Sequence, residues 1–255
     1  MQKHKTVSRL TPEENSRRIA SMWSRFVDWG KRRKSENGFL IKQLALHGAS
    51  SVLNAALGDG CDGIYLAKKG FRIIGNEIDK NWRELATKNA KEHGVVIPCT
   101  TYDWRSMGFR DSEFDATICL GSSLCMLFDA EERLNAIGEF SRVSGKLLII
   151  DERNYQRILD QREQILSTGN FPYSYRYVYC GREVIGYPVE IIDNRVVFEY
   201  RDVRTGETAH LEMYPFKRGE LERELGAVFP HVTRFSDYRE GFDANADFYQ
   251  YVATK

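Results

Sequence analysis

The sequence predicts an α/β fold, in which helices cover both faces of a mostly parallel sheet and an antiparallel β subdomain is inserted. Short apolar strands alternate with amphipathic helices between residues 50 and 152, and this order is typical of a parallel sheet with right-handed crossovers. Residues 173–216 instead alternate apolar and polar side chains, as antiparallel hairpins do. We therefore expect one parallel core with an insertion.

Two helices are predicted before the first strand. From about Ser16, apolar side chains recur at helical spacing, and a second apolar stripe spans residues 39–46 before Gly48 ends it. The first stripe consists of Ile19, Met22, Trp23 and Phe26. Residues 1–15 are polar and are expected to fray.

The alternating part supplies five predicted strands and three helices. The strands are 50–57, 71–77, 95–103, 114–121 and 146–152, and the helices are 62–70, 80–94 and 130–144. Glycines close the first two helices at Gly70 and Gly94, and Asp79 is a suitable N-cap residue.

The inserted part begins after Asn154. Four tyrosines with period 2, at positions 173, 175, 177 and 179, indicate one face of a strand, and the pairs Asp193-Asn194 and Thr205-Gly206 indicate hairpin turns. A helix at 217–229 and a strand at 248–255 are expected to follow.

Composition excludes several classes of function. The chain has 37 basic and 36 acidic residues, so its bulk charge does not favour nucleic acid or an anionic membrane as a partner. No apolar run approaches the roughly 20 residues of a membrane span, and we expect a cytoplasmic protein. The five cysteines show no C-x-x-C spacing, which argues against a disulfide framework or a zinc site. Free thiols and no metal are expected.

A glycine-rich turn follows the first strand. Gly58, Gly60 and Gly63 form a G-x-G-x-x-G pattern, which allows a tight turn and close approach to a ligand. The ligand could be a dinucleotide whose pyrophosphate binds the turn, or S-adenosylmethionine, whose amino-acid part would lie over it. Glu77 would bind ribose hydroxyls in either case, so these residues do not discriminate.

Residues beyond Glu77 favour S-adenosylmethionine. Asp103 and Trp104 follow the third strand and could bind the amine and the face of an adenine. After the fourth strand, "CLGSSLCML" would lie across the sheet's switch point from the glycine turn, where ligands bind in open α/β sheets. Trp104 could instead be a core residue, but its neighbour Asp103 favours the adenine role.

From Val52 to Asp160 the chain resembles class I S-adenosylmethionine-dependent methyltransferases, and among them the glycine and glycine/sarcosine N-methyltransferases. The motifs that carry the resemblance are "FDATICLGSSLCML" and "LLIIDERNYQRIL". The resemblance implies a Rossmann-like class I methyltransferase fold with a seven-stranded sheet. It divides the chain into an N-terminal helical lid or substrate segment (1–48), a cofactor-binding core (49–155), an antiparallel β insertion (156–215) and the C-terminal part of the core (216–255).

The resemblance also implies the site residues. The cofactor set is Arg33 for the methionine carboxylate, Leu57, Gly58 and Gly60 in the turn, Glu77 with Ile78 at the ribose, Asp103 and Trp104 at the adenine, and Leu120 on the fourth strand. On the acceptor side, Arg153 would bind a carboxylate, with Tyr214 from the insertion and Ser122 from the loop after the fourth strand. Gly63 would lie in the helix after the turn. Arg153 could alternatively pair with Asp151 at the surface.

Three positions depart from the family pattern. Asn54 replaces an acid at the end of the first strand, Ser122 replaces an asparagine, and Phe26 replaces an aromatic hydroxyl. The last two lie on the acceptor side, so the acceptor stays open.

The expected reaction is methyl transfer to the nitrogen of a small amine or amino-acid-like acceptor that carries a carboxylate. A natural-product N- or O-methyltransferase for a larger acceptor and a catalytically silent S-adenosylmethionine-binding partner protein are the alternatives. The resemblance is compatible with a homo-oligomer. No Asn/Asp-Pro-Pro-Tyr motif of base methyltransferases follows the fourth strand.

Overall fold

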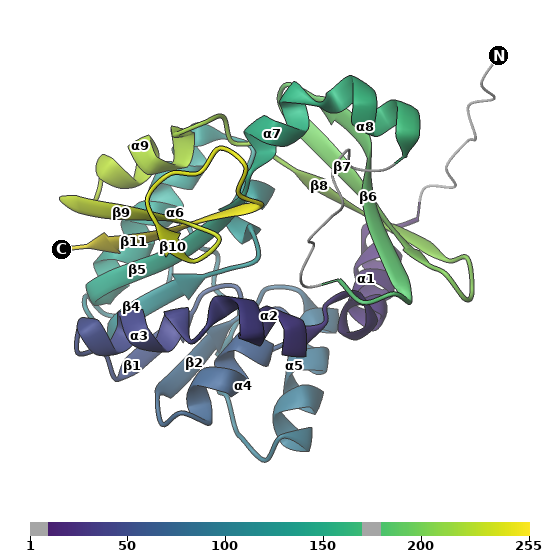
Figure 1. Ribbon diagram of the computed structural model, residues 1–255. Coiled ribbons are helices and arrows are strands. Elements are labelled where there is room, and N and C mark those ends of the chain that lie inside the picture. Colours follow the sequence, from purple (N-terminus) through teal and green to yellow (C-terminus); the bar gives the residue numbers. More distant parts are fainter. Residues whose placement is uncertain (1–9, 170–179) are drawn as a thin grey trace.

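The structure, a computed structural model, describes residues 10–169 and 180–255 (Figure 1). The strand predicted from the tyrosines at 173–179 lies outside these residues. The main sheet contains β1 (Ser51–Asn54), β2 (Arg72–Asn76), β3 (Cys99–Thr100), β4 (Phe114–Cys119), β5 (Ser144–Arg153), β9 (His231–Ser236), β10 (Arg239–Glu240) and β11 (Phe248–Thr254). A separate sheet contains β6 (Val184–Ile192), β7 (Arg195–Asp202) and β8 (Thr208–Met213).

The main sheet confirms the predicted fold class. Its strand order is β10-β9-β11-β5-β4-β1-β2-β3. The strands from β5 to β3 are parallel, whereas β11, β9 and β10 pair antiparallel. The resemblance implied seven strands, and the described residues form an eighth, the two-residue β10 at the sheet edge. β1 is buried along its whole length, as expected for a parallel strand covered on both faces.

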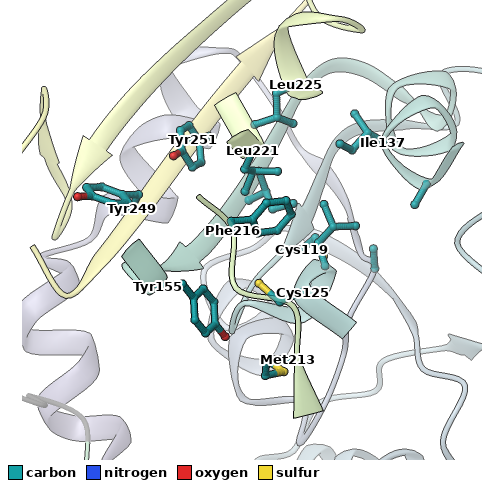
Figure 2. Close-up of a cluster of buried hydrophobic side chains, with 14 of the residues drawn as sticks. Cys119, Cys125, Ile137, Tyr155, Met213, Phe216, Leu221, Leu225, Tyr249 and Tyr251 are labelled. Carbon is teal, nitrogen blue, oxygen red and sulfur yellow. The ribbon is translucent and has the colours of Figure 1, made fainter. Parts of the chain in front are cut away.

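Helices cover both faces of the main sheet. They are α3 (Phe39–Leu46), α4 (Cys61–Ala67), α5 (Lys80–Glu92), α6 (Ala130–Val143) and α9 (Glu220–Gly226), and α7 (Tyr155–Asp160) and α8 (Arg162–Thr168) lead toward the small sheet. Apolar side chains of α3 and α4 pack on one face of the sheet, and those of α6 and α9 pack on the other. Figure 2 shows part of the apolar cluster on the side of α6 and α9, where Cys119 and Cys125 are buried among apolar side chains.

The N-terminal segment contains three helices where two were predicted. α1 (Pro12–Phe26) begins before Ser16 because Thr11 and Glu14 form a capping box and Pro12 occupies the first turn. The additional helix, α2 (Trp29–Glu36), is almost entirely polar. It has no apolar stripe, so the periodicity of apolar side chains could not predict it.

The predicted strand at 95–103 is much shorter in the structure. Only Cys99 and Thr100 pair with β2. Pro98 has no amide hydrogen to donate, and the side chain of Val96 is 89% exposed. β3 is therefore a short edge strand, and the residues after it form a loop.

The small sheet confirms the two predicted hairpins. β6 pairs with β7 across Asp193-Asn194, and β7 pairs with β8 across a turn that includes Thr205-Gly206. Figure 1 shows this sheet beside α1 and separate from the main sheet. Asn15 of α1 holds the edge strand β8, since its side chain donates to the carbonyl of His210 (2.6 Å) and accepts from the amide of that residue (2.8 Å).

In the described parts of the chain, no helix is long and apolar enough to cross a membrane. The same residues contain no group of three or more His, Cys, Asp or Glu side chains that could hold a metal ion. All five cysteines are free.

Candidate functional site

The site lies where the carboxyl ends of four parallel strands meet. β1, β2, β4 and β5 are neighbours in the sheet, and the segments after β1, β2 and β4 and the last residue of β5 hold most of the predicted residues. Such an edge is where ligands bind in open α/β sheets.

The glycine turn after β1 depends on left-handed backbone conformations. Gly58 has a φ of 55° and Gly60 a φ of 82°, which glycine adopts without strain. A Cβ atom at Gly60 would also lie 3.2 Å from the side chain of Ala86 in α5. Gly63 lies in α4, as predicted, where a Cβ would be 3.1 Å from Ile97. Its lack of a side chain thus lets α4 pack closely.

Glu77 joins the ends of β1 and β2. One of its carboxylate oxygens accepts from the amide of Gly58 and the other from the amide of Asp79, both at 3.0 Å. Burial is the largest influence on this carboxyl and raises its pKa. The next side chain, Ile78, is 67% exposed. A half-buried acid and an exposed apolar side chain are therefore neighbours.

Leu57 and Leu120 form apolar walls near these polar groups. Both are buried. A Cβ on Gly75 of β2 would lie 2.6 Å from the Leu57 side chain, so the absence of a side chain at Gly75 makes room for Leu57. Leu120 belongs to the apolar cluster on the α3 side of the sheet.

Trp104 and Asp103 are consecutive residues of the loop after β3, and their side chains form hydrogen bonds with different parts of the chain. The Trp104 indole donates to the carbonyl of Ala55 just after β1 (2.7 Å), and its ring packs edge-on against Phe140 of α6 at the margin of the apolar core. The carboxylate of Asp103 accepts from the guanidinium of Arg105 (2.9 Å), and this interaction lowers its pKa to about 2. Arg105 also pairs with Glu132 at the start of α6.

Arg33 forms part of a charge network between α2 and the glycine turn. It donates to Glu36 (2.6 Å), to Asp62 (2.6 Å) and to the carbonyl of Cys61 (3.2 Å). Arg32 donates to the same two carboxylates, at 2.7 and 3.2 Å. The set of Arg32, Arg33, Glu36 and Asp62 has no net formal charge.

Arg32 was not predicted as a site residue. Residues 31–34 are four consecutive cations, and only the rotational phase of α2 decides which of them face inward. Burial raises the pKa of Asp151 at the end of β5, and the charge of Arg32 is the main influence opposing that rise. The charge of Arg32 therefore acts both on Asp62 beside the glycine turn and on Asp151 at the end of β5.

The loop after β4 is bound to the end of β5 through Ser122. Its amide donates to Asp151 (2.7 Å), and its hydroxyl accepts from the amide of Arg153 (2.8 Å). Two of the predicted acceptor-side residues, Ser122 and Arg153, are thus in direct contact. Asp151 was considered only as a surface partner of Arg153, but it is buried.

Arg153 faces aromatic side chains of the small sheet. Its guanidinium carbon lies 5.1 Å from the centre of the Phe198 ring, and its positive charge acts on the phenol of Tyr200. The Tyr200 ring packs edge-on against Phe26 of α1, with 4.8 Å between centroids. Tyr200 was missed, because the alternation along β7 does not show which face meets the core.

Tyr214 reaches the loop after β4 through its main chain. Its amide donates to the carbonyl of Cys125 (2.7 Å), while its hydroxyl donates to Glu220 of α9 (2.7 Å). Its ring lies over the guanidinium of Arg133. The hydroxyl is therefore directed to α9 in this structure.

Comparison with known proteins gives a consistent result. Residues 52–146 match a family described as a methyltransferase domain. A glycine/sarcosine N-methyltransferase of Parasynechococcus marenigrum is 36% identical and one of Halorhodospira halochloris is 32% identical; both alignments cover 91% of this chain, and they cover 81% and 85% of the relatives. A solved S-adenosylmethionine-dependent methyltransferase of Clostridium acetobutylicum superimposes with a TM-score of 0.67 at 17% identity, covering 87% of this chain and 91% of that one.

Proposed function

Because the chain belongs to the family of glycine/sarcosine N-methyltransferases and is an S-adenosylmethionine-dependent enzyme, we propose that it methylates the amino group of a small amino acid held by Arg153. The observation that carries this proposal is the position of Arg153. It ends β5, bonds to the loop after β4 through Ser122 and faces the aromatic side chains of the small sheet.

The residues after β1 and β2 fit the cofactor. Glu77 is a half-buried carboxylate at the glycine turn, and it would accept hydrogen bonds from ribose hydroxyls. Ile78 exposes an apolar surface beside it, and the Trp104 ring is fixed at the end of β1. These two side chains would bound an adenine, with Asp103 at its edge. The Asp103 carboxylate would then share its interactions with Arg105.

The methionine end of the cofactor would meet the charge network of α2. The carboxylate of the cofactor would accept a hydrogen bond from one of the two arginines. An acid such as Asp62 would balance the positive charge of the cofactor's ammonium group. Asn54 is uncharged, so these neighbouring carboxylates would have to supply the negative charge. We assign Arg33 and Arg32 jointly to this end, since both bond to the same acids.

When bound, S-adenosylmethionine supplies a methyl group on a positively charged sulfur, which departs as a neutral thioether. The protein then needs mainly to align the acceptor nitrogen with that methyl group, and alignment of this kind can contribute ~7–11 kcal/mol. Arg153 would bind the acceptor's carboxylate, while Phe26 and Tyr200 would limit the space for its side chain. Ser122 would hold the main chain of Arg153, and Tyr214 would support the loop after β4.

The Arg153→Ala substitution tests this assignment. We expect the acceptor KM to rise roughly 30-fold or more, because a carboxylate loses a charged partner, while the cofactor Kd measured by calorimetry stays within about twofold. Arg162→Ala, at an exposed arginine of α8, is the control and should match wild type. Unchanged KM and kcat in folded Arg153→Ala would remove Arg153 from the acceptor site.

The acceptor itself is found by a screen with methyl-labelled S-adenosylmethionine. Small amino acids should be labelled in preference to larger amines and hydroxyl compounds, and the reverse preference would support the natural-product alternative. A homo-oligomer and a cytoplasmic location stay predictions. The division at residues 48, 155 and 215 is likewise a proposal, supported by the separate sheet of β6–β8.

A further inference from the structure

The loop after β4 contains two consecutive left-handed residues. Gly121 has a φ of 79° and Ser122 a φ of 58°, and a short 3-10 helix (Ser123–Met126) follows. For a non-glycine residue the left-handed conformation is unfavourable. A buried serine in this conformation needs compensating interactions.

Two hydrogen bonds, one between Asp151 and Ser122 and one between Ser122 and Arg153, supply these interactions. The Asp151 carboxylate accepts from the Ser122 amide at 2.7 Å, and the Ser122 hydroxyl accepts from the Arg153 amide at 2.8 Å. Both Asp151 and Ser122 are about 4% exposed. The two bonds run between residues 29 and 31 positions apart, so they join two strand ends rather than close a local turn.

The carboxylate form of Asp151 suits this position better than the acid form. Asp151 accepts a hydrogen bond from the amide of Ser122, and the nearby amide of Gly121 also favours its charged form; an ionised acceptor binds such a donor more strongly than a neutral one. Burial nevertheless raises its pKa to about 6. Its charge can therefore change within the range of pH in which an enzyme is assayed.

We infer that Asp151 is a positioning residue of the acceptor site: as a carboxylate it holds the Gly121–Ser122 turn, and through Ser122 it holds the main chain of Arg153. This inference rests on the proposed function, because it assigns Asp151 to the binding of the same acceptor. Asp151 itself touches neither reacting atom in this assignment.

Other titratable groups also act on Asp151. Arg32 from α2 favours its charged form, and Asp62 from α4 opposes it. Cys119 of β4, Cys125 of the 3-10 helix and Glu152 on the same strand interact with its charge in turn. Glu152 lies next to Asp151 but its side chain bonds to Tyr251 of β11 (2.7 Å), which makes it a matched control.

The test compares Asp151→Asn with wild type at pH 5–7.5. Because the acceptor's own ionisation affects all variants equally, the ratio of acceptor KM values isolates residue 151. We expect Asp151→Asn to raise KM about tenfold at pH 7.5 and only about twofold at pH 5, where about nine in ten wild-type carboxyls are protonated. Glu152→Gln should give a ratio near one throughout. A pH-independent ratio for Asp151→Asn, or a change in cofactor Kd alone, would overturn the inference.

Two further measurements apply even if Asp151→Asn does not fold. Ser122→Ala removes only the hydroxyl acceptor and should raise the acceptor KM about fivefold or more. In isotopically labelled wild-type protein, the amide resonances of Gly121 and Ser122 should shift with a midpoint near pH 6. An unchanged KM in Ser122→Ala, or amides that do not titrate, contradicts the inference whatever the acceptor is. A wild-type enzyme that binds the cofactor but methylates no amino acid contradicts the proposed function instead.

Discussion

Glu152 is the second buried carboxyl at the end of β5. It is 3% exposed and accepts a hydrogen bond from the Tyr251 phenol (2.7 Å). Burial, with the negative charges of Glu220 and Asp151, raises its pKa to about 8 from the ordinary value of 4.5. The folded protein therefore keeps a proton on Glu152 at a pH where the unfolded chain has lost it.

The stability of the protein should consequently depend on Glu152 as the pH changes. The contribution of this group is complete below about pH 4.5 and is lost as the pH rises toward 8, because the unfolded chain releases its proton first. We predict that Glu152→Gln matches wild type near pH 4.5 and melts several degrees higher at pH 8.5. Glu163→Gln, at an exposed acid of α8, is the control. An equal Tm difference at both pH values would refute the role of ionisation.

At the scale of single residues, the sequence indicated which segments lie near one another but not which side chains bond to each other. The meeting of Gly58 with Glu77 follows from strand order alone, because consecutive parallel strands end at one edge. The Arg105 partner of Asp103 and the Glu220 partner of Tyr214 depend on rotamers and on packing of distant elements. Neither the spacing nor the composition of the sequence contains that information.

At the scale of elements, Arg133 joins α6 to α9. Its side chain is 1% exposed and bonds to Glu224 (2.7 Å), and it donates to the carbonyls of Leu127 and Phe128 (3.2 and 2.9 Å). Its guanidinium also lies 4.1 Å from the centre of the Tyr214 ring. One cation thus connects the helix after the β4 loop, the helix α9 and the segment that leaves the small sheet.

Removing that cation should be strongly destabilising. Arg133→Met leaves the Glu224 carboxylate without its buried partner, and loss of one member of such a pair costs about 3–5 kcal/mol. Urea titration at neutral pH measures this loss as a change in the free energy of unfolding. Arg223→Met, at an exposed position of α9, should change this free energy by no more than about 0.5 kcal/mol. Similar values for the two variants would mean that Arg133 contributes little.

Elements with apolar periodicity were predicted closely, and those without it were missed. α6 was expected at 130–144 and spans Ala130–Val143. α2 is stabilised instead by its charge network and by the Trp29 indole, which donates to Asp59 (3.0 Å). The predicted strand at 95–103 has good β-forming residues, but only Cys99 and Thr100 of it pair with β2. Tertiary contacts decided both cases.

At the scale of the whole molecule, α1 and the small sheet meet at Gly181. Its amide donates to the carbonyl of Phe26 (2.7 Å), and Val27 forms a bridge with Cys180. A Cβ atom at Gly181 would lie 2.2 Å from the carbonyl oxygen of Arg25, so any side chain must move the backbone. This junction sets where Phe26 stands relative to Tyr200.

Gly181→Ala should therefore damage acceptor binding more than cofactor binding. A displacement of the small sheet by a fraction of an ångström to about 1 Å should lower kcat/KM for the acceptor about tenfold or more, with the cofactor Kd within about twofold of wild type. Gly226→Ala, where an added Cβ meets nothing within 4 Å, should leave both constants unchanged. Equal losses in cofactor affinity and in acceptor kcat/KM would show that the substitution does not act through the position of the small sheet.

The pairing of Arg153 with Phe248 of β11 also bears on the order in which the two halves of the site form during synthesis. The glycine turn and Glu77 are surrounded by strands that lie within one continuous stretch of about 100 residues, so they can form early. Arg153 gains its neighbouring strand only after β11, the final described element, has been translated. Contacts so distant along the chain close slowly. A nascent chain would thus acquire its cofactor side before its acceptor side.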